Sequence, residues 1–113
     1  MPVVHYNAYF SIVDGSDSET ALRVVREFLA GLQARGLVNR FSVLKNCNAG
    51  SKTQLPPFQA DIVFNDHEQM AKPFTMVGAE GVHVGDHGAM LAHVGGLVVE
   101  VFEEINPLGV AKA

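Results

Sequence analysis

The chain of 113 residues has no tryptophan, a single cysteine, and few charged residues, which make up 18% of it. The single cysteine, Cys47, excludes an internal disulfide, and a lone thiol is typical of proteins from a reducing compartment. No basic segment followed by an apolar run marks a secretory signal, and no apolar run is long enough to span a bilayer. We therefore expect a cytoplasmic protein.

Positive charge is also scarce, because 8 lysines and arginines stand against 12 acidic residues, for a net charge of −4. Nucleic acids and anionic membranes are bound by clustered basic side chains, and the chain has no such cluster, so we expect neither as a partner. Hydrophobic residues make up 48% of the chain, and 113 residues suffice for one core but not two. We expect residues 1–113 to form a single domain.

Residues 5–12 alternate between two sets of side chains with a period of two, which is the pattern of a β-strand with one buried face. The sets are Tyr6, Ala8, Phe10 and Ile12, and His5, Asn7, Tyr9 and Ser11. The first set is mainly apolar, and we expect it to face the core. The second is polar but partly aromatic, which suits a pocket or a subunit interface.

Turn and capping residues divide the rest of the chain. Ser16 and Glu19 have the spacing of a capping box, so we expect a helix just after Ser16, and Gly36 is placed to end it. The other elements expected are strands at 41–46, 58–64 and 97–105, a helix capped by Asn65 or Asp66 that kinks or restarts at Pro73, and a short helix at 86–94 ended by Gly95 and Gly96.

This order of strands and helices is the βαββαβ, or ferredoxin-like, plan of the α+β class, with a four-stranded antiparallel sheet and both helices on one face. The face away from the helices would carry His5, Asn7, Tyr9, Leu44, Asn46, Gln59, Asp61 and Val63. The last strand would add either Leu97, Val99 and Val101, or Val98, Glu100 and Phe102, and the sequence leaves both registers open.

Apolar side chains on this second face, among them Tyr9, Leu44 and Val63, would form an exposed patch in a monomer. Such patches usually mark a partner, and symmetric dimers are the commonest oligomers. We therefore expect a homodimer packed sheet to sheet, with an open face in water as the alternative.

Three segments are used for comparison with known families: the polar-aromatic first strand, Met90-Leu-Ala-His-Val, and Val98-Val-Glu-Val-Phe-Glu-Glu. In these and in its element order, over residues 3–105, the chain resembles the dimeric α/β-barrel superfamily, which includes antibiotic-biosynthesis monooxygenase-like and stress-responsive barrel proteins. The resemblance implies a sheet-to-sheet dimeric barrel. It also implies a ligand pocket between the sheet and the second helical region of each subunit.

Some members of that superfamily are cofactor-free oxygenases, and others degrade haem. The haem-degrading members use an asparagine on the first strand with a histidine and a tryptophan from the helical region. The resemblance places the first two at Asn7 and at His83 or His87. Because the chain has no tryptophan, we expect no haem, and we expect no other cofactor.

Histidine spacing raises the question of a metal site. On a helix, His83 and His87 would share a face and could share a metal, with His93 further along. Glycines at 81, 85 and 88 weaken the helix there, and the glutamate of the HExxH signature is missing. We therefore expect histidines at the surface or at a pocket rim, and no metal.

Asp61 could act as a general base inside a barrel, or it could be a structural, hydrogen-bonded aspartate. His5, Asn7 and Tyr9 could orient a small polar or phenolic ligand, or form the dimer interface.

Together these observations favour a small-molecule-binding homodimer. Its pocket would be made by His5, Asn7, Tyr9, Asp61, His83 and His87. One alternative is a cofactor-independent, monooxygenase-like enzyme acting on an aromatic or polyketide-like substrate. Another is a structural or stress-associated dimer whose barrel is filled by side chains. The sequence does not decide whether the protein is an enzyme.

Overall fold

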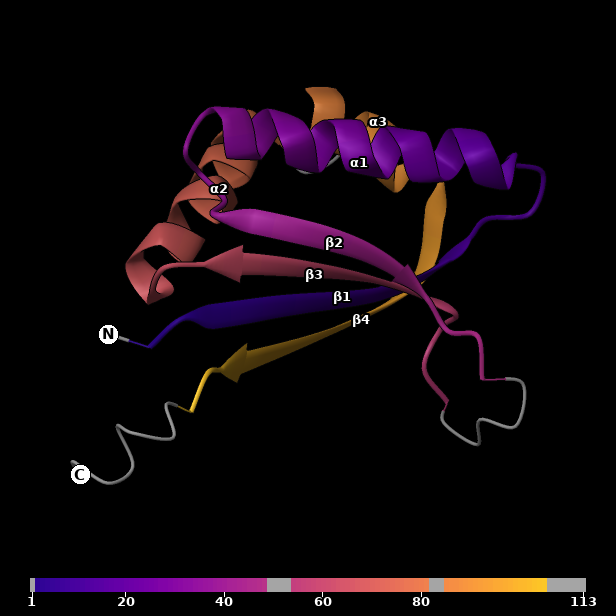
Figure 1. Ribbon diagram of the computed structural model, residues 1–113. Helices are drawn as coiled ribbons and strands as arrows, with labels where there is room; N and C mark the ends of the chain where they lie inside the picture. The colour runs from indigo at the N-terminus through magenta and orange to yellow at the C-terminus, as the bar shows by residue number, and fades with distance from the viewer. Residues whose placement is uncertain (1, 49–53, 82–84, 106–113) are drawn as a thin grey trace.

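The computed structural model describes residues 2–48, 54–81 and 85–105, which form a four-stranded antiparallel sheet covered on one face by three helices (Figure 1). The elements are β1 (Val4–Ile12), α1 (Ser18–Ala34), β2 (Arg40–Lys45), β3 (Phe58–Phe64), α2 (His67–Glu80), α3 (Gly85–Leu91) and β4 (Val94–Glu103). The strand order is β2-β3-β1-β4, so β1 and β3 are central. The expected α+β, ferredoxin-like fold is confirmed. No described helix is both long and apolar enough to cross a membrane.

Strand β1 divides its side chains between the two faces of the sheet as its alternation predicts. Tyr6 and Ala8 pair with Ile62 and Ala60 of β3 on the face that the helices cover. Burial of this face against α1 removes apolar surface from water, which is the main force that holds the layers together. The buried cluster consists of Val4, Phe10, Val25, Leu29, Leu32, Val38, Ala60 and Phe64.

Helix α1 begins one residue later than the capping box predicts. Asp17, not Ser16, is the N-cap, because its carboxylate accepts a hydrogen bond from the backbone N–H of Thr20 at 2.9 Å. The predicted end of the helix is confirmed, since Gly36 follows the C-cap with a φ of 73°.

Asp66, one of the two residues predicted to cap helix α2, is its N-cap. Asp66 accepts a hydrogen bond from the Gln69 backbone at 2.8 Å, and the Gln69 side chain accepts one from the Asn65 backbone at 2.6 Å. The helix does not restart at Pro73 but continues through it to Glu80. Pro73 is buried within this helix, and it removes one backbone hydrogen-bond donor.

The register of β4 settles the choice that the sequence leaves open. The pairs are Tyr9 with Val98, Asn7 with Glu100, and His5 with Phe102. Val98, Glu100 and Phe102 therefore share the face that points away from the helices. Leu97, Val99 and Val101 point to the helix side.

The last helix is shorter than predicted, because α3 ends at Leu91 and both Gly95 and Gly96 lie inside β4. The glycines do not end a helix. They accommodate a bulge, since β4 has one more residue than β1 between the partners of Tyr9 and Ser11. Gly96 adopts a φ of 61°, which a residue without a Cβ reaches at no steric cost.

Candidate functional site

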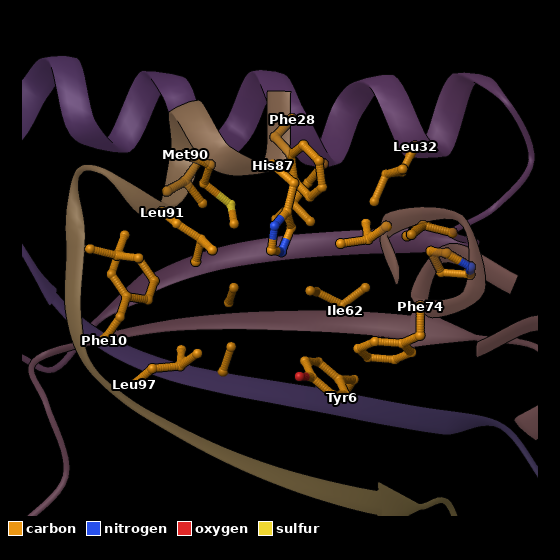
Figure 2. Close-up of a pocket in the computed structure, with 18 of the residues that line it drawn as sticks. Tyr6, Phe10, Phe28, Leu32, Ile62, Phe74, His87, Met90, Leu91 and Leu97 are labelled. Atoms are coloured by element: carbon orange, nitrogen blue, oxygen red, sulfur yellow. The ribbon is translucent and has the colours of Figure 1, made fainter. Parts of the chain in front are cut away.

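An apolar cavity of about 140 Å³ lies between the sheet and the helices (Figure 2). Its floor includes Ala8 and Ala60, which are paired directly across β1 and β3. Protein interiors are normally close-packed, and two adjacent alanines leave space that larger side chains would fill. We call this cavity the helix-side pocket.

Two aromatic pairs flank the Ala8–Ala60 pair, one on each side along the strands. At one end Tyr6 packs against Phe74 of α2, with ring centroids 5.1 Å apart and an angle of 57° between the rings. At the other end Phe10 stacks on Phe58, with centroids 5.7 Å apart. Tyr6, Phe74 and Phe10 line the helix-side pocket, so two of its walls are aromatic.

Helices α1 and α3 form the roof of the pocket. Phe28 comes from α1, and His87, Met90 and Leu91 come from α3 (Figure 2). The His87 imidazole meets the Phe28 ring edge to face, with centroids 5.5 Å apart. This contact holds the imidazole over the sheet, at the centre of the roof.

The helix-side pocket is nearly without polar groups. Of the described residues that line it, none is an aspartate, glutamate, lysine or arginine, and the polar side chains are those of Tyr6 and His87. Burial raises the pKa of the Tyr6 phenol above its ordinary value of 10.0, because the phenolate loses its hydration. Tyr6 is therefore a neutral hydrogen-bond donor at physiological pH.

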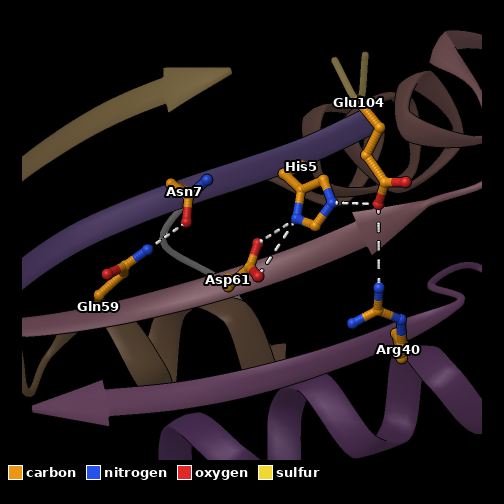
Figure 3. A network of polar contacts seen from close by, with 6 residues as sticks. All are labelled: His5, Asn7, Arg40, Gln59, Asp61 and Glu104. Carbon is orange, nitrogen blue, oxygen red and sulfur yellow. Dashed lines mark hydrogen bonds and ion pairs between the residues drawn. The ribbon is translucent and has the colours of Figure 1, made fainter. Parts of the chain in front are cut away.

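The opposite face of the sheet carries a chain of polar contacts, which we call the sheet-face network (Figure 3). The His5 Nδ1 lies 2.9 Å from an Asp61 carboxylate oxygen, and its Nε2 lies 2.7 Å from the Glu104 carboxylate. Arg40 extends the chain at 4.0 Å from the same Glu104 oxygen. Both ring nitrogens of His5 thus face carboxylates, so the doubly protonated imidazolium fits this place best.

These contacts raise the pKa of His5 above its ordinary value of 6.5. The largest cause is the hydrogen bond to Glu104, followed by the hydrogen bond to Asp61, while partial desolvation of the imidazolium acts in the opposite direction. The hydrogen bonds outweigh desolvation because a hydrogen bond to a charged group is roughly twice as strong as a neutral one. Asp61 is therefore hydrogen-bonded to a cation, which is the structural alternative considered from the sequence.

Asn7 is buried on the same face, with 5% of its surface exposed. Its side-chain oxygen accepts a hydrogen bond from the Gln59 amide of β3. A buried amide requires such a partner, since an unsatisfied polar group is costly away from water. This hydrogen bond joins β1 to β3 on the far face.

The structure divides the residues predicted for the pocket between two faces. His87 lines the helix-side pocket. His5, Asn7 and Asp61 are joined in contacts on the far face, and Tyr9 lies there beside Gln59 and Val98. The cause is that His5, Asn7 and Tyr9 share the face of β1 that points away from the helices, whereas His87 comes from α3 on the other face. His83 lies outside the described residues.

Sequence reasoning missed Tyr6 as a site residue because it assigned the whole alternating set to the core. The sequence does contain a feature that could have identified Tyr6, because it places a hydroxyl in a set of otherwise apolar side chains. A tyrosine at such a position usually directs its hydroxyl to a polar partner or to a ligand.

Within residues 2–48, 54–81 and 85–105, no three histidine, cysteine, aspartate or glutamate side chains are arranged to hold a metal ion. His93 is occupied elsewhere, because its Nδ1 lies 3.3 Å from the Ser16 hydroxyl.

Comparison with known proteins places the chain in a family. Residues 3–106 match the model of the family of unknown function DUF6614, and the chain belongs to this family. No curated protein matches the chain.

Solved structures with low sequence identity share its fold. A variant of SnoaB, a cofactor-independent oxygenase from Streptomyces nogalater, is 15% identical, with a TM-score of 0.67 and coverage of 96% of this chain and 98% of that one. A dabb family protein with a ferredoxin-like fold from Mesorhizobium loti is 15% identical, with a TM-score of 0.63 and coverage of 94% and 100%. A dimeric protein of unknown function from Bacteroides fragilis is 18% identical, with a TM-score of 0.55 and coverage of 90% and 96%. These structures confirm the ferredoxin-like fold that the resemblance implies.

Proposed function

We propose that this member of DUF6614 is a homodimeric small-molecule-binding protein whose ligand occupies the helix-side pocket. The observation that carries the proposal is the cavity of about 140 Å³ above Ala8 and Ala60, with aromatic walls and two polar groups. Ligand pockets in proteins typically combine a mainly apolar lining with a few polar groups that fix orientation. The helix-side pocket has this composition.

The size of the cavity limits the ligand. An engineered cavity of about 150 Å³ lined by Leu, Ile and Phe stays dry and binds benzene. The helix-side pocket is of similar volume and composition. It therefore suits a ligand that places one ring, or an apolar group of that size, between Tyr6 and Phe10.

Toluene binding tests this proposal. Titration followed by NMR should give saturable binding, and Ala8→Leu should weaken it by about 10-fold or more, which corresponds to about 1.4 kcal/mol. The added carbon atoms of leucine would occupy the space above the floor. Ala30→Leu is the matched control, because Ala30 is exposed on α1 and should leave affinity unchanged. Equal affinity in both variants would contradict the proposal.

The homodimer is supported by the far face of the sheet. Leu44, Val98 and Phe102 lie on this face and remain 48%, 38% and 49% exposed. Large apolar side chains of this kind usually mark an interface. The Bacteroides fragilis protein of the same fold is dimeric. A second copy placed sheet to sheet would cover these residues.

Sedimentation velocity at micromolar concentration tests the dimer. We expect a dimer for the wild-type chain and a monomer for Phe102→Asp, which would bury an unpaired charge at the interface. Ala30→Asp is the control, since Ala30 is exposed on α1, which covers the opposite face of the sheet. A wild-type monomer, or dissociation of the control alone, would overturn this part of the proposal.

A second candidate function is catalysis of the type shown by SnoaB, a cofactor-independent oxygenase. The observation in its favour is that both polar side chains of the helix-side pocket, Tyr6 and His87, can carry a transferable proton. Proton transfer to or from a bound ketone would exchange deuterium from D₂O into its α-carbon. A rate of deuterium exchange above that in buffer alone, which decreases in the His87→Gln variant, would favour an enzyme. A rate equal to that in buffer alone would favour a binding protein.

A further inference from the structure

Tyr6 carries the only hydroxyl among the described side chains that line the helix-side pocket. Among residues 2–48, 54–81 and 85–105, none forms a hydrogen bond with this hydroxyl. Figure 2 shows its oxygen on the side of the ring away from Phe74, with the ring itself packed on Phe74. The ring position is thus fixed by packing, while the hydroxyl is left to interact with what enters the pocket.

The charge of the pocket restricts its ligand further. A charged group moved from water into an apolar site without a partner is strongly disfavoured. No described residue of the lining offers a carboxylate, an ammonium or a guanidinium group. The charged side chains of β1 and β3 lie instead on the far face, where His5 is held between Asp61 and Glu104.

The shape of the pocket adds a third restriction. Ala8 and Ala60 lie in its floor, and the aromatic rings of Tyr6 and Phe10 line it on either side of these alanines. Aromatic rings attract one another in offset and edge-to-face arrangements beyond the effect of buried area alone. A planar ring is therefore better suited to this space than a branched aliphatic group.

From these observations we propose that the helix-side pocket selects an uncharged aromatic compound with a carbonyl oxygen, which accepts a hydrogen bond from the Tyr6 hydroxyl. This inference rests on the proposed function, since it names the class of ligand for the same pocket. Because burial keeps Tyr6 protonated, it is a donor over the whole physiological range. Carboxylates of the same size are excluded by charge, and hydrocarbons of the same size bind without selection by Tyr6.

Three probes of nearly equal size test the inference: acetophenone, which is neutral with a carbonyl oxygen, cumene, which lacks the oxygen, and benzoate, which is an anion. Each is titrated by NMR at pH 8.5, above the ordinary titration range of histidine. The decisive quantity is the ratio of the cumene Kd to the acetophenone Kd, because this ratio removes the general difference in hydrophobicity between variants.

The Tyr6→Phe variant keeps the ring on Phe74 and removes only the hydroxyl. We expect the ratio to fall by about 3- to 10-fold in this variant, which is the usual net effect of a neutral hydrogen bond. Tyr9→Phe is the matched control, because Tyr9 lies on the same strand but on the far face. The ratio should be unchanged in the control, and benzoate should bind at least 10-fold more weakly than acetophenone, as expected for a buried charge without a partner.

The outcomes separate the two proposals. Binding that Ala8→Leu abolishes, combined with a ratio that Tyr6→Phe does not alter, would overturn the inference and leave the pocket in place. Benzoate binding as tightly as acetophenone would also overturn it. If none of the probes bound, or if Ala8→Leu had no effect on any of them, the proposed function itself would fall. Thermal unfolding of each variant distinguishes a lost hydroxyl from a lost fold.

Discussion

The sheet-face network makes the stability of the protein depend on pH through His5. We consider the substitution His5→Gln, which keeps a polar side chain but cannot carry a positive charge. The folded state raises the pKa of His5 by hydrogen bonds to Glu104 and Asp61. A group whose pKa is raised by folding stabilises the folded state when it is protonated. This contribution is complete below the ordinary pKa of about 6.5 and is lost as the pH rises through the higher pKa of the folded state.

The exposure of the partners sets the size of the effect. A hydrogen bond to a charged group contributes about 1.5–3 kcal/mol when it is shielded from water. The side chains of His5 and Asp61 are 20% and 22% exposed, so we assign this bond a value at or below the lower end of that range. Glu104 is 48% exposed, and exposed pairs contribute only about 0–1 kcal/mol. With solvent screening included, the two hydrogen bonds of His5 together contribute about 1–2 kcal/mol.

Urea unfolding followed by circular dichroism at pH 5.5, 7.5 and 9.0 measures this quantity at a fixed protein concentration. We expect His5→Gln to lower the free energy of unfolding by about 1–2 kcal/mol at pH 5.5. The deficit should decline steadily toward pH 9.0.

His67→Gln is the matched control for this series. His67 also faces a carboxylate, Glu103 at 2.6 Å, but the two side chains are 50% and 54% exposed. The control should therefore change stability by less than about 1 kcal/mol. A deficit of His5→Gln that is equal at all three pH values, or larger at pH 9.0, would refute the reasoning.

Three further substitutions test how the fold is built. Asp17→Ala should lower the free energy of unfolding, because α1 loses its N-cap, and calorimetry measures the change as a lower Tm. Gly96→Ala should cost about 1–2 kcal/mol in a urea titration, since its φ of 61° is strained for any residue with a Cβ; an unchanged midpoint would argue against the bulge in β4. Leu29→Ala should cost about 2–5 kcal/mol, because Leu29 is 3% exposed in the core, and a loss below 1 kcal/mol in guanidinium unfolding would contradict that placement.

Local sequence patterns predict much of this fold because they reflect the geometry of single elements. The alternation in β1 correctly divides Tyr6 and Ala8 from His5 and Asn7, since a strand has only two faces. The reciprocal cap of Asp66 and Gln69 is likewise a local feature with a fixed spacing.

The errors arise where a residue has two structural uses. A glycine pair after a helical segment commonly ends a helix, but here Gly95 and Gly96 serve a bulge. Which use applies depends on how β4 pairs with β1, and that pairing is not encoded locally. The same limit explains why the register of β4 stays open in the sequence.

The site predicted from the sequence and the pocket found in the structure lie on different faces of the sheet. His5, Asn7 and Asp61 attract attention as polar groups on a strand, yet their hydrogen bonds are satisfied within the sheet. The helix-side pocket, where we propose that a ligand binds, depends instead on Ala8 and Ala60, which have no chemical signature and matter only because the register pairs them. Cavities are produced by such pairings between distant segments, so a single sequence does not reveal them.

The most direct test of the helix-side pocket is to locate a bound acetophenone by NMR in the full chain with labelled methyl groups. Nuclear Overhauser effects between its ring protons and the methyl groups of Ile62, Met90 and Leu91 are expected, since these residues line the pocket. Contacts confined to the methyl groups of Leu44 and Val98, on the far face of the sheet, would contradict the account.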